Sequence, residues 1–304
     1  MSLPTSTGYY RAEAAYAGLL KRLGLVDAMS VFELPTIEVW RSITERENCV
    51  LDYNDSDTGP GRLHIKRNKP GHRGVDDEAA AIRLLMDAKL PTVPLVAAGR
   101  LNDGRGFLIT DDLKGYDDAE VSVRDGLPFE TVLNATAELA GRLHAAGLHH
   151  RDLYLCHFYV DASGSLSRYA GGGLRRGAGG FEVAPDDGRP PPPPSPGVPG
   201  EEARPPARLM DAGRVKPLPT WFRRRWVVKD VAQFVYSVRK LGVAAASVDA
   251  WLAEYAAVSR TVIDASFRRA IERKVAAIGR HDARLLKRQP TRNVGIDKTA
   301  KGQS

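Results

Sequence analysis

The feature that most constrains this chain is a run of ten residues in its middle, residues 149–158, with the sequence HHRDLYLCHF. The run follows residues 129–146, which carry the apolar spacing of a helix, and Gly147, which stands where helices commonly end on a glycine. An apolar stretch that is typical of a strand begins within the run. Helix, glycine, charged loop and strand therefore form the centre of the expected fold.

This run matches the catalytic loop of protein kinases, H-R-D-L-x-x-x-N, in which the aspartate accepts the proton of an attacking hydroxyl. The pattern makes Asp152 the candidate base, with Arg151 and His150 as the other candidate catalytic residues. His157 stands five residues after Asp152, where the pattern has a metal-binding Asn. It is a candidate metal ligand or, because Mg²⁺ prefers oxygen, a hydrogen-bonding spacer.

Phosphoryl transfer also needs a group that holds the nucleotide phosphates. Lys66 is the candidate, because it shares one face of the expected strand 63–66 with His64, as the Lys of V-A-I-K would. Glu78, in the first turn of the following helix, is its candidate partner, although the helix dipole alone would also explain an acid there. Asp112, the last residue of the expected first lobe, is a third nucleotide-binding candidate.

A carboxylate that could hold a metal ion lies downstream of the catalytic loop. Asp211 is followed by Ala212 and Gly213, which resembles D-F-G after an apolar strand. The glycine would permit the sharp turn that aims the carboxylate. Asp211 and His157 together form the expected metal site, and Mg²⁺ is the expected ion.

The order of the expected elements indicates the fold class. Apolar and polar patterning predicts a short helix within residues 9–29, a helix over residues 76–89, and strands at 37–40, 49–53, 63–66, 93–98 and 106–110. Later helices are expected at 129–146, 226–241, 248–263 and 266–278. We therefore predict an α+β, two-lobed, protein-kinase-like fold, with a small antiparallel-sheet lobe at residues 1–112 and a larger helical lobe at 113–284.

Two segments differ from the rest in composition. Gly and Pro occupy 19 of the 37 positions from 170 to 206, so we expect a disordered insertion there. Residues 265–304 carry 11 Lys and Arg against 3 Asp and Glu, a local charge of +8 in a chain whose total is +7. Residues 285–304 are expected to form a flexible basic tail. The basic segment is either a solvated terminus without a partner or a site of attraction to an anionic partner, which is a membrane surface, a phosphorylated glycan or nucleic acid.

Composition also bears on the compartment. The chain has two cysteines, no apolar run long enough to cross a bilayer, and a polar start without the layout of a signal peptide. These features favour a cytoplasmic protein.

The motifs together resemble the bacterial lipopolysaccharide kinase family, which includes core heptose kinases and Kdo kinases. Residues 150–158 are similar to the family loop H-R-D-x-Y-x-C-H-F, which carries His at the position of the kinase Asn. Residues 211–215 and 225–233 are similar to further family signatures. The resemblance runs from about residue 30 to residue 262, interrupted by the insertion.

The resemblance implies ATP as phosphate donor, Mg²⁺ as metal and a sugar hydroxyl of a cell-envelope glycolipid as acceptor. It also implies that Asp230 is the helix aspartate that anchors the catalytic loop. We therefore expect an ATP-dependent phosphotransferase with an alcohol group as acceptor, which acts on a lipopolysaccharide-core or related sugar. Its expected location is the cytoplasm and, peripherally, the inner membrane face, with no nucleic-acid partner.

Two alternatives stay open at this point. One is a kinase for a small molecule or a protein side chain. The other is a pseudokinase or scaffold of weak activity, favoured by the absence of glycine from residues 42–48, the loop expected to cover the phosphates. The presence of candidates at Lys66, Asp152 and Asp211 favours an enzyme.

Overall fold

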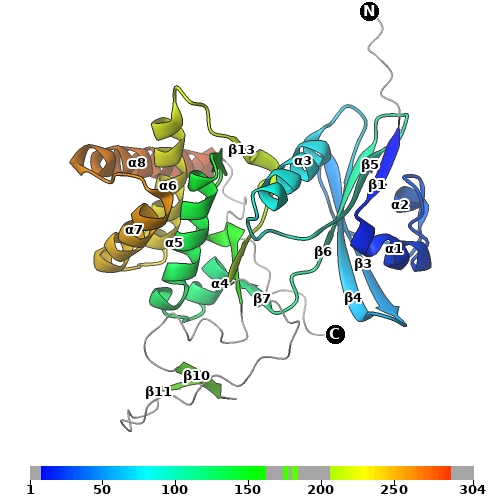
Figure 1. Ribbon diagram of the computed structural model, residues 1–304, viewed down its shortest axis with the longest axis horizontal. Coiled ribbons are helices and arrows are strands. Elements are labelled where there is room, and N and C mark those ends of the chain that lie inside the picture. The colour runs from blue at the N-terminus through cyan, green and yellow to red at the C-terminus, as the bar shows by residue number, and fades with distance from the viewer. Residues whose placement is uncertain (1–7, 162–173, 178–179, 184–205, 289–304) are drawn as a thin grey trace, which may run out of the picture.

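A computed structural model describes residues 8–161, 174–177, 180–183 and 206–288 of the protein. A sheet lobe and a helical lobe lie side by side, joined by the segment between β6 (Gly106–Asp111) and β7 (Tyr116–Asp118) (Figure 1). The predicted α+β, two-lobed architecture is therefore confirmed.

The first lobe is built on one antiparallel sheet of six strands in the order β1-β5-β6-β4-β3-β2. The remaining bounds are β1 (Tyr9–Ala12), β2 (Glu38–Ser42), β3 (Arg46–Asp55), β4 (Gly59–Asn68) and β5 (Leu95–Arg100). Five of these strands were expected from the sequence, and β3 and β4 are longer than expected because they pair along ten residues. Strands β4 and β6 lie in the middle of the sheet, which fixes the position of Lys66.

The two faces of this sheet have different coverings. Helices α1 (Ala17–Arg22) and α2 (Ser30–Glu33) lie on one face, and α3 (Gly74–Asp87) lies on the other, toward the helical lobe (Figure 1). Leu63 and Ile65 are almost fully buried in the core on the α1 and α2 side. Because strand side chains alternate, His64 and Lys66 point to the opposite face, toward the second lobe.

The start of the chain differs from the prediction. A helix was expected within residues 9–29, but Tyr9–Ala12 form the edge strand β1 and pair with β5, and the helix α1 is short. A four-residue strand that pairs with a distant partner leaves little periodic signal of its own. Tertiary pairing therefore decided this element.

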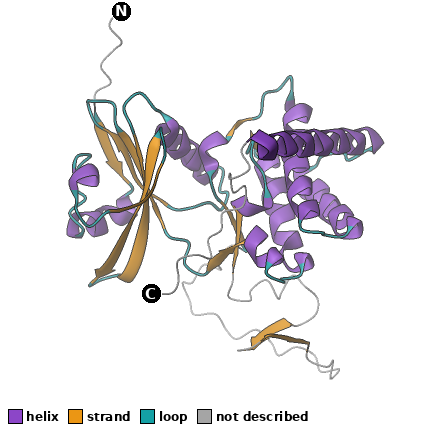
Figure 2. Ribbon diagram, turned by 180° about the vertical axis from the view of Figure 1, so that it is seen from behind, coloured by secondary structure: helices purple, strands orange, loops and turns teal. Residues whose placement is uncertain are grey.

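The second lobe is a helical bundle (Figure 2), and a stack of aromatic side chains is buried in its core. Its helices are α4 (Ala119–Arg124), α5 (Phe129–Ala145), α6 (Arg223–Lys240), α7 (Ala245–Ser259) and α8 (Ala265–Arg288). Phe234 of α6 stacks on Trp251 of α7 with ring centroids 4.0 Å apart, and Tyr255 stacks on Trp251 at 5.4 Å. This stack locks α6 in place, and α6 is the helix that carries the catalytic loop's anchors.

Short strands tie the loops to this bundle. β9 (Phe158–Asp161) lies between β7 and β12 (Ala207–Leu209), and β8 (Leu148–His149) pairs with β13 (Lys216–Pro217). The Gly- and Pro-rich insertion therefore begins after β9 and ends before β12, and these two strands pair with each other. The prediction of disorder over residues 170–206 did not anticipate β10 (Leu174–Gly177) and β11 (Gly180–Val183), which pair antiparallel. The rest of that segment up to residue 205 lies outside the described residues.

Helix α8 continues to Arg288, past the boundary at residue 285 that was predicted for the tail. Residues 289–304 lie outside the described residues. No helix in the described part of the chain combines the length and the apolar character that crossing a bilayer would require.

Candidate active site

The catalytic-loop segment is held by hydrogen bonds from its own backbone to one helix. Asp230 of α6 accepts from the backbone N–H of His150 at 2.7 Å and from that of Arg151 at 2.9 Å. Its carboxylate is fully buried and also lies 3.3 Å from Nε2 of His144. Burial alone would raise the pKa of Asp230, but the interactions with His144 and His150 together outweigh it and hold this pKa below its usual value. The expected anchoring role of Asp230 is consistent with this geometry.

Two further side chains of α6 continue the same attachment. Oε1 of Gln233 accepts from the backbone N–H of Leu153 at 3.2 Å, and Oγ of Ser237 accepts from that of Leu155 at 2.9 Å. Asp230, Gln233 and Ser237 therefore form a buried polar stripe with helical spacing, and the N–H groups of residues 150, 151, 153 and 155 find their acceptors there.

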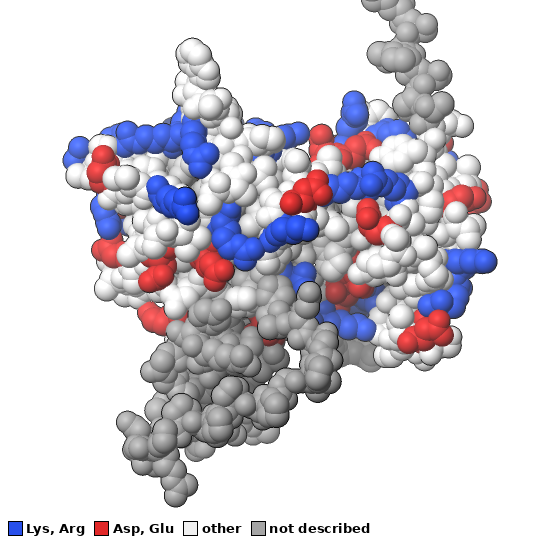
Figure 3. Space-filling view, viewed as in Figure 1, with Lys and Arg blue, Asp and Glu red and all other residues white. Residues whose placement is uncertain are grey.

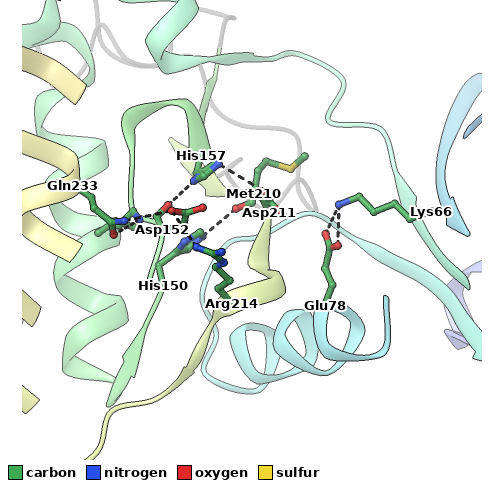
Figure 4. Close-up of polar contacts among 10 residues, drawn as sticks. Lys66, Glu78, His150, Asp152, His157, Met210, Asp211, Arg214 and Gln233 are labelled. Carbon is green, nitrogen blue, oxygen red and sulfur yellow. Dashed lines mark hydrogen bonds and ion pairs between the residues drawn. The ribbon is translucent and has the colours of Figure 1, made fainter. Parts of the chain in front are cut away.

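Asp152 lies at the end of this rigid loop. Its Oδ1 accepts a hydrogen bond from Nε2 of Gln233 at 3.3 Å and lies 3.8 Å from Nη1 of Arg214 (Figure 4). The side chain remains 28% exposed and lines a cavity of about 780 Å³ on the α6 and α8 side. An orientated, accessible carboxylate in a cavity is suited to accept a proton from a bound hydroxyl.

The other two residues of the predicted catalytic group do not face that cavity. His150 is fully buried, and its Nε2 donates to the carbonyl oxygen of Met210 at 3.1 Å. Burial lowers the pKa of His150 to about 4, so the ring is neutral at neutral pH. The guanidinium of Arg151 lies over the ring of Trp226. Both residues position the loop, and Asp152 alone of the three borders the cavity.

His157 links the loop to Asp211. Its Nδ1 donates to the carbonyl oxygen of Asp152, and its Nε2 lies 3.7 Å from Oδ2 of Asp211 (Figure 4). The carbonyl can only accept, so the Nδ1 of this ring carries a proton. A neutral ring thus turns a lone pair toward Asp211, and a protonated ring turns a donor toward it.

Asp211 has the exposure and backbone geometry of a functional residue. It adopts a left-handed conformation with φ of 51°, which is uncommon for a residue with a side chain, and its carboxylate is 52% exposed. Burial would raise the pKa of the Asp211 carboxyl, but the positive charges around it, Lys66 first and then His157, together outweigh this effect and lower the pKa. The carboxylate is therefore ionised and available to a cation.

The donor set fits a magnesium ion in part. Asp211 supplies the carboxylate oxygen that Mg²⁺ prefers, whereas His157 offers a nitrogen. Among the described residues, no three His, Cys, Asp or Glu side chains gather as a metal site.

The predicted Lys66–Glu78 pair is present. Nζ of Lys66 donates to both oxygens of Glu78, at 2.6 and 2.8 Å, and Glu78 is 5% exposed (Figure 4). A separation of 12 residues suffices because β4 leads directly into α3 through residues 69–73. A Cβ built on Gly213 would lie 3.6 Å from Cβ of Glu78, so the Asp211 turn packs against the same helix.

Asp112 lies apart from this pair. Asp112 directly follows β6, at the start of the connection between the lobes, and its Oδ1 lies 3.0 Å from Nε2 of His64. His64 is on β4, the strand that pairs with β6. His64 and Lys66 share a face of β4, so Asp112 stands beside the same interlobe surface without contacting Lys66.

The turn between β2 and β3 has no glycine but is tight, with the N–H of Ile43 donating to the carbonyl of Arg46 at 2.9 Å. The positive charge of Arg46 contributes to the lowered pKa of Asp211, although less than the charge of Lys66 does. Nε of Arg46 is buried without a hydrogen-bond partner among the described residues. Arg46 was not among the predicted site residues, because a basic residue in a turn is ordinarily solvated.

Comparison with known proteins supports the resemblance seen in the motifs. Residues 59–170 match the model of the Lipopolysaccharide kinase (Kdo/WaaP) family. The predicted resemblance to the lipopolysaccharide kinases is confirmed. Lipopolysaccharide core heptose(I) kinase WaaP of Pseudomonas aeruginosa is 30% identical over 105 residues, which is 31% of this chain and 39% of that protein. The match thus spans well under two thirds of the curated relative.

A solved structure extends the lipopolysaccharide kinase likeness to the fold. The structure described as WaaP in complex with acyl carrier protein aligns with a TM-score of 0.58 and 20% identity. The alignment covers 88% of this chain and 98% of that one. The protein therefore shares the fold of a lipopolysaccharide kinase across both lobes.

The region matched to the lipopolysaccharide kinase family holds Lys66, Glu78 and Asp152, but neither Asp211 nor the α6 anchors. Asp211 and Asp230 were predicted from the motifs and the family resemblance, but the contacts of Gln233 and Ser237 with the loop were not. The signal for them was present: three polar residues at positions 230, 233 and 237 interrupt the apolar face of a helix. Such a stripe is expected where a helix binds a loop backbone.

Proposed function

We propose that this protein is an ATP-dependent kinase that phosphorylates a hydroxyl of a lipopolysaccharide-core or related cell-envelope sugar. The observation that carries the proposal is the arrangement of Asp152, Asp211 and the Lys66–Glu78 pair (Figure 4). Base, metal carboxylate and phosphate-binding cation occur together between the lobes, as phosphoryl transfer requires. A scaffold would not need all three.

On the donor side, Lys66 binds the nucleotide phosphates and Glu78 keeps its ammonium group in place. Arg46 is the proposed phosphate contact from the β2–β3 turn, where a glycine-rich loop is absent. An arginine can bind phosphate through two N–H groups, so it replaces backbone donors of such a loop. Asp112 and His64 are proposed to border the nucleotide.

Asp211 is the residue that would hold the proposed metal ion, Mg²⁺, and the bound ion would supply positive charge to the phosphates of the nucleotide. His157 donates to the carbonyl of Asp152 and lies beside the carboxylate of Asp211. It would therefore fix the position of the proposed base relative to the proposed metal ligand. Replacing Asp211 by Ala should weaken the metal-dependent part of ATP affinity.

On the acceptor side, Asp152 takes the proton of the attacking hydroxyl. The cavity of about 780 Å³ before it has the volume of a site for a small ligand or a sugar. Polar side chains from several elements line it, including Asp118, Arg124 and Tyr154. This lining can hydrogen-bond the hydroxyl groups that surround a sugar's reacting oxygen.

The decisive experiment is transfer of labelled phosphate from ATP to a panel of sugars, glycolipids and proteins by the wild type and Asp152→Asn. We expect transfer to a sugar or glycolipid, with the variant slower by about 10²–10⁴-fold and equal in ATP affinity and melting temperature. Asp87→Asn, on the exposed side of α3, is the matched control. Wild-type protein that binds no ATP would favour a scaffold, and transfer to proteins alone would replace the proposed acceptor.

We further propose that the protein works in the cytoplasm at an anionic membrane surface. Helix α8 supplies the basic residues of the C-terminal segment that the structure describes, and Trp221 and Phe222 are 93% and 62% exposed just before α6. Exposed aromatic residues beside cations are typical of protein surfaces that enter the headgroup region. The arrangement would present the acceptor cavity to a glycolipid.

This membrane proposal is tested with vesicles of anionic and neutral lipid. Trp221→Ala with Phe222→Ala should weaken binding to anionic vesicles, and salt should weaken it further. Trp40→Ala, which removes an aromatic residue that is 59% exposed on β2, is the control. Equal binding to neutral and anionic vesicles would contradict the electrostatic part of the proposal.

A further inference from the structure

A second cavity, of about 820 Å³, lies beside the catalytic loop between the start of α6 and the middle of α8. The charged side chains that line it are all cationic. The loop and α6 contribute Arg151, Arg224, Arg225 and Lys229. Helix α8 contributes Arg269, Arg273 and Lys274. Lys and Arg gather along this edge of the molecule, over α8 and the start of α6 (Figure 3).

These cations are largely uncompensated. Within the described part of the chain, Arg224 alone of the set forms an ion pair, with Asp264 at 3.8 Å. Nε of Arg151 is buried and has no hydrogen-bond partner there. Like charges that converge on one cavity repel one another, so the cluster is stabilised when an anion enters.

The inner wall of the cavity is already ordered. The guanidinium carbon of Arg151 lies 5.1 Å from the ring centroid of Trp226, and Nζ of Lys229 lies 5.6 Å from it. Nζ of Lys229 also donates to the carbonyl oxygen of Arg151. Burial lowers the pKa of Lys229, and an anion beside it would oppose that shift. Two cations held on one aromatic ring need little rearrangement to bind a ligand.

This cavity adjoins the acceptor cavity. Lys229, Lys274 and Ala277 line both. Through its bond to Arg151, Lys229 also contacts the residue directly before Asp152. A molecule whose hydroxyl lies at Asp152 can therefore extend an anionic group into the cationic cavity.

We propose that the cationic cavity binds a phosphate group that the acceptor already carries, distinct from the group being transferred. The inference rests on the proposed kinase function and narrows its substrate to phosphorylated sugars or glycolipids. A phosphate monoester is favoured because its dianionic, multidentate oxygens match several converging Arg and Lys donors.

The test measures binding by calorimetry to the full chain without nucleotide or metal, so it does not depend on turnover. The probes are inorganic phosphate, glucose 6-phosphate, glucose and vesicles that contain phosphatidic acid. Arg269→Gln with Arg273→Gln removes two exposed cations of the cavity. Arg280→Gln with Arg284→Gln removes the same charge from exposed positions of α8 that line neither cavity.

We expect glucose 6-phosphate to bind more tightly than glucose or inorganic phosphate, and to bind the cavity variant at least about tenfold more weakly. The control variant and Lys66→Met combined with Glu78→Gln should bind it as the wild type does. Loss of binding in this double variant but not in the cavity variant would overturn the proposal, because the phosphate would then occupy the nucleotide site. Equal binding of inorganic phosphate and glucose 6-phosphate, or binding to vesicles alone, would also overturn an acceptor-borne phosphate.

A kinetic arm separates this inference from the proposed function. If transfer to glycolipids or sugars occurs, the cavity variant should have a higher KM for phosphorylated acceptors than the wild type, with unchanged kcat and unchanged KM for ATP. Phosphate binding without any transfer would leave the cavity as an anion site and remove the kinase proposal. Transfer without a KM change would remove the cavity from acceptor binding while the kinase proposal stands.

Discussion

The two halves of the candidate active site are secured in different ways. On the catalytic side, backbone N–H groups at residues 150, 151, 153 and 155 bind three buried side chains of α6. On the nucleotide side, Lys66 is held by one acidic partner, Glu78, and the β2–β3 turn carries Arg46 in place of glycines. The proposed base, Asp152, therefore lies on a loop that is tied to the core of its lobe by several hydrogen bonds, whereas the ammonium group of Lys66, the proposed phosphate-binding residue, is held by a single ion pair among the described residues.

This difference has a physical reason. A base must meet one hydroxyl in a fixed geometry, and a small displacement slows the reaction strongly. The phosphate-binding side must admit and release a nucleotide, so it benefits from side chains that can move. Substitutions on the two sides should therefore differ in whether they cost stability or ligand affinity.

The largest effect is expected for Asp230→Ala. It removes the acceptor for two backbone N–H groups and leaves His144 without its carboxylate, so the free energy of unfolding should fall by about 3–5 kcal/mol. Denaturant unfolding measures the change. Asp249→Ala, which breaks an exposed ion pair with Arg268, is the control and should cost less than about 1 kcal/mol. If both variants lost the same free energy of unfolding, Asp230 would not anchor the catalytic loop more firmly than an exposed ion pair holds the surface.

Lys66→Met combined with Glu78→Gln should act on affinity instead. The double change avoids a buried, unpaired charge, so the melting temperature should change little. ATP affinity should fall by about 1.5–3 kcal/mol, because a charged hydrogen bond to phosphate is lost. Calorimetry with ATP measures this, and Lys69→Met, an exposed neighbour, is the control. A large fall in the free energy of unfolding with unchanged ATP affinity would show that Lys66 and Glu78 stabilise the fold and do not bind the nucleotide.

Gln233→Leu should show both effects at a smaller scale. It leaves the N–H of Leu153 unpaired and frees the carboxylate of Asp152, so stability should fall by about 1–3 kcal/mol and kcat by roughly tenfold. Ser237→Ala removes the corresponding acceptor for Leu155 without touching Asp152. If both variants slow turnover equally, Gln233 does not orient the base.

The smallest effect concerns pH. Burial lowers the pKa of His150 from 6.5 to about 4, so the folded protein binds fewer protons at this ring than the unfolded chain between these values. Its contribution to stability is therefore complete above about pH 6.5 and is lost as the pH falls toward 4. Ring signals in NMR spectra, assigned with His150→Asn, should show a neutral His150 at pH 5. A ring that titrates near 6.5 would mean that the loop is open to water.

Much of the site could be predicted from order along the chain. The H-R-D run, the strand lysine and the D-x-G turn occur in the sequence that phosphoryl transfer uses, and the structure brings Lys66, Glu78, His157 and Asp211 together. Alternation in residues 63–66 also predicted correctly which face Lys66 occupies. These signals are local, so they survive in a single sequence.

Other features depended on contacts between distant segments. Residues 9–12 became an edge strand because β5 offered an unpaired edge, and the sequence of four residues cannot reveal a partner almost ninety positions away. The roles of His150 and Arg151 as supports, and of Gln233 as the residue that holds Asp152, follow from the approach of α6 to the loop. The cationic cavity forms because α8 lies against the start of α6, so side chains from residues 151–274 converge.

The sequence by itself thus determined the chemical groups and their order, since these are carried by local patterns. Only the tertiary structure decided which of them touch, because long-range packing sets distance and burial.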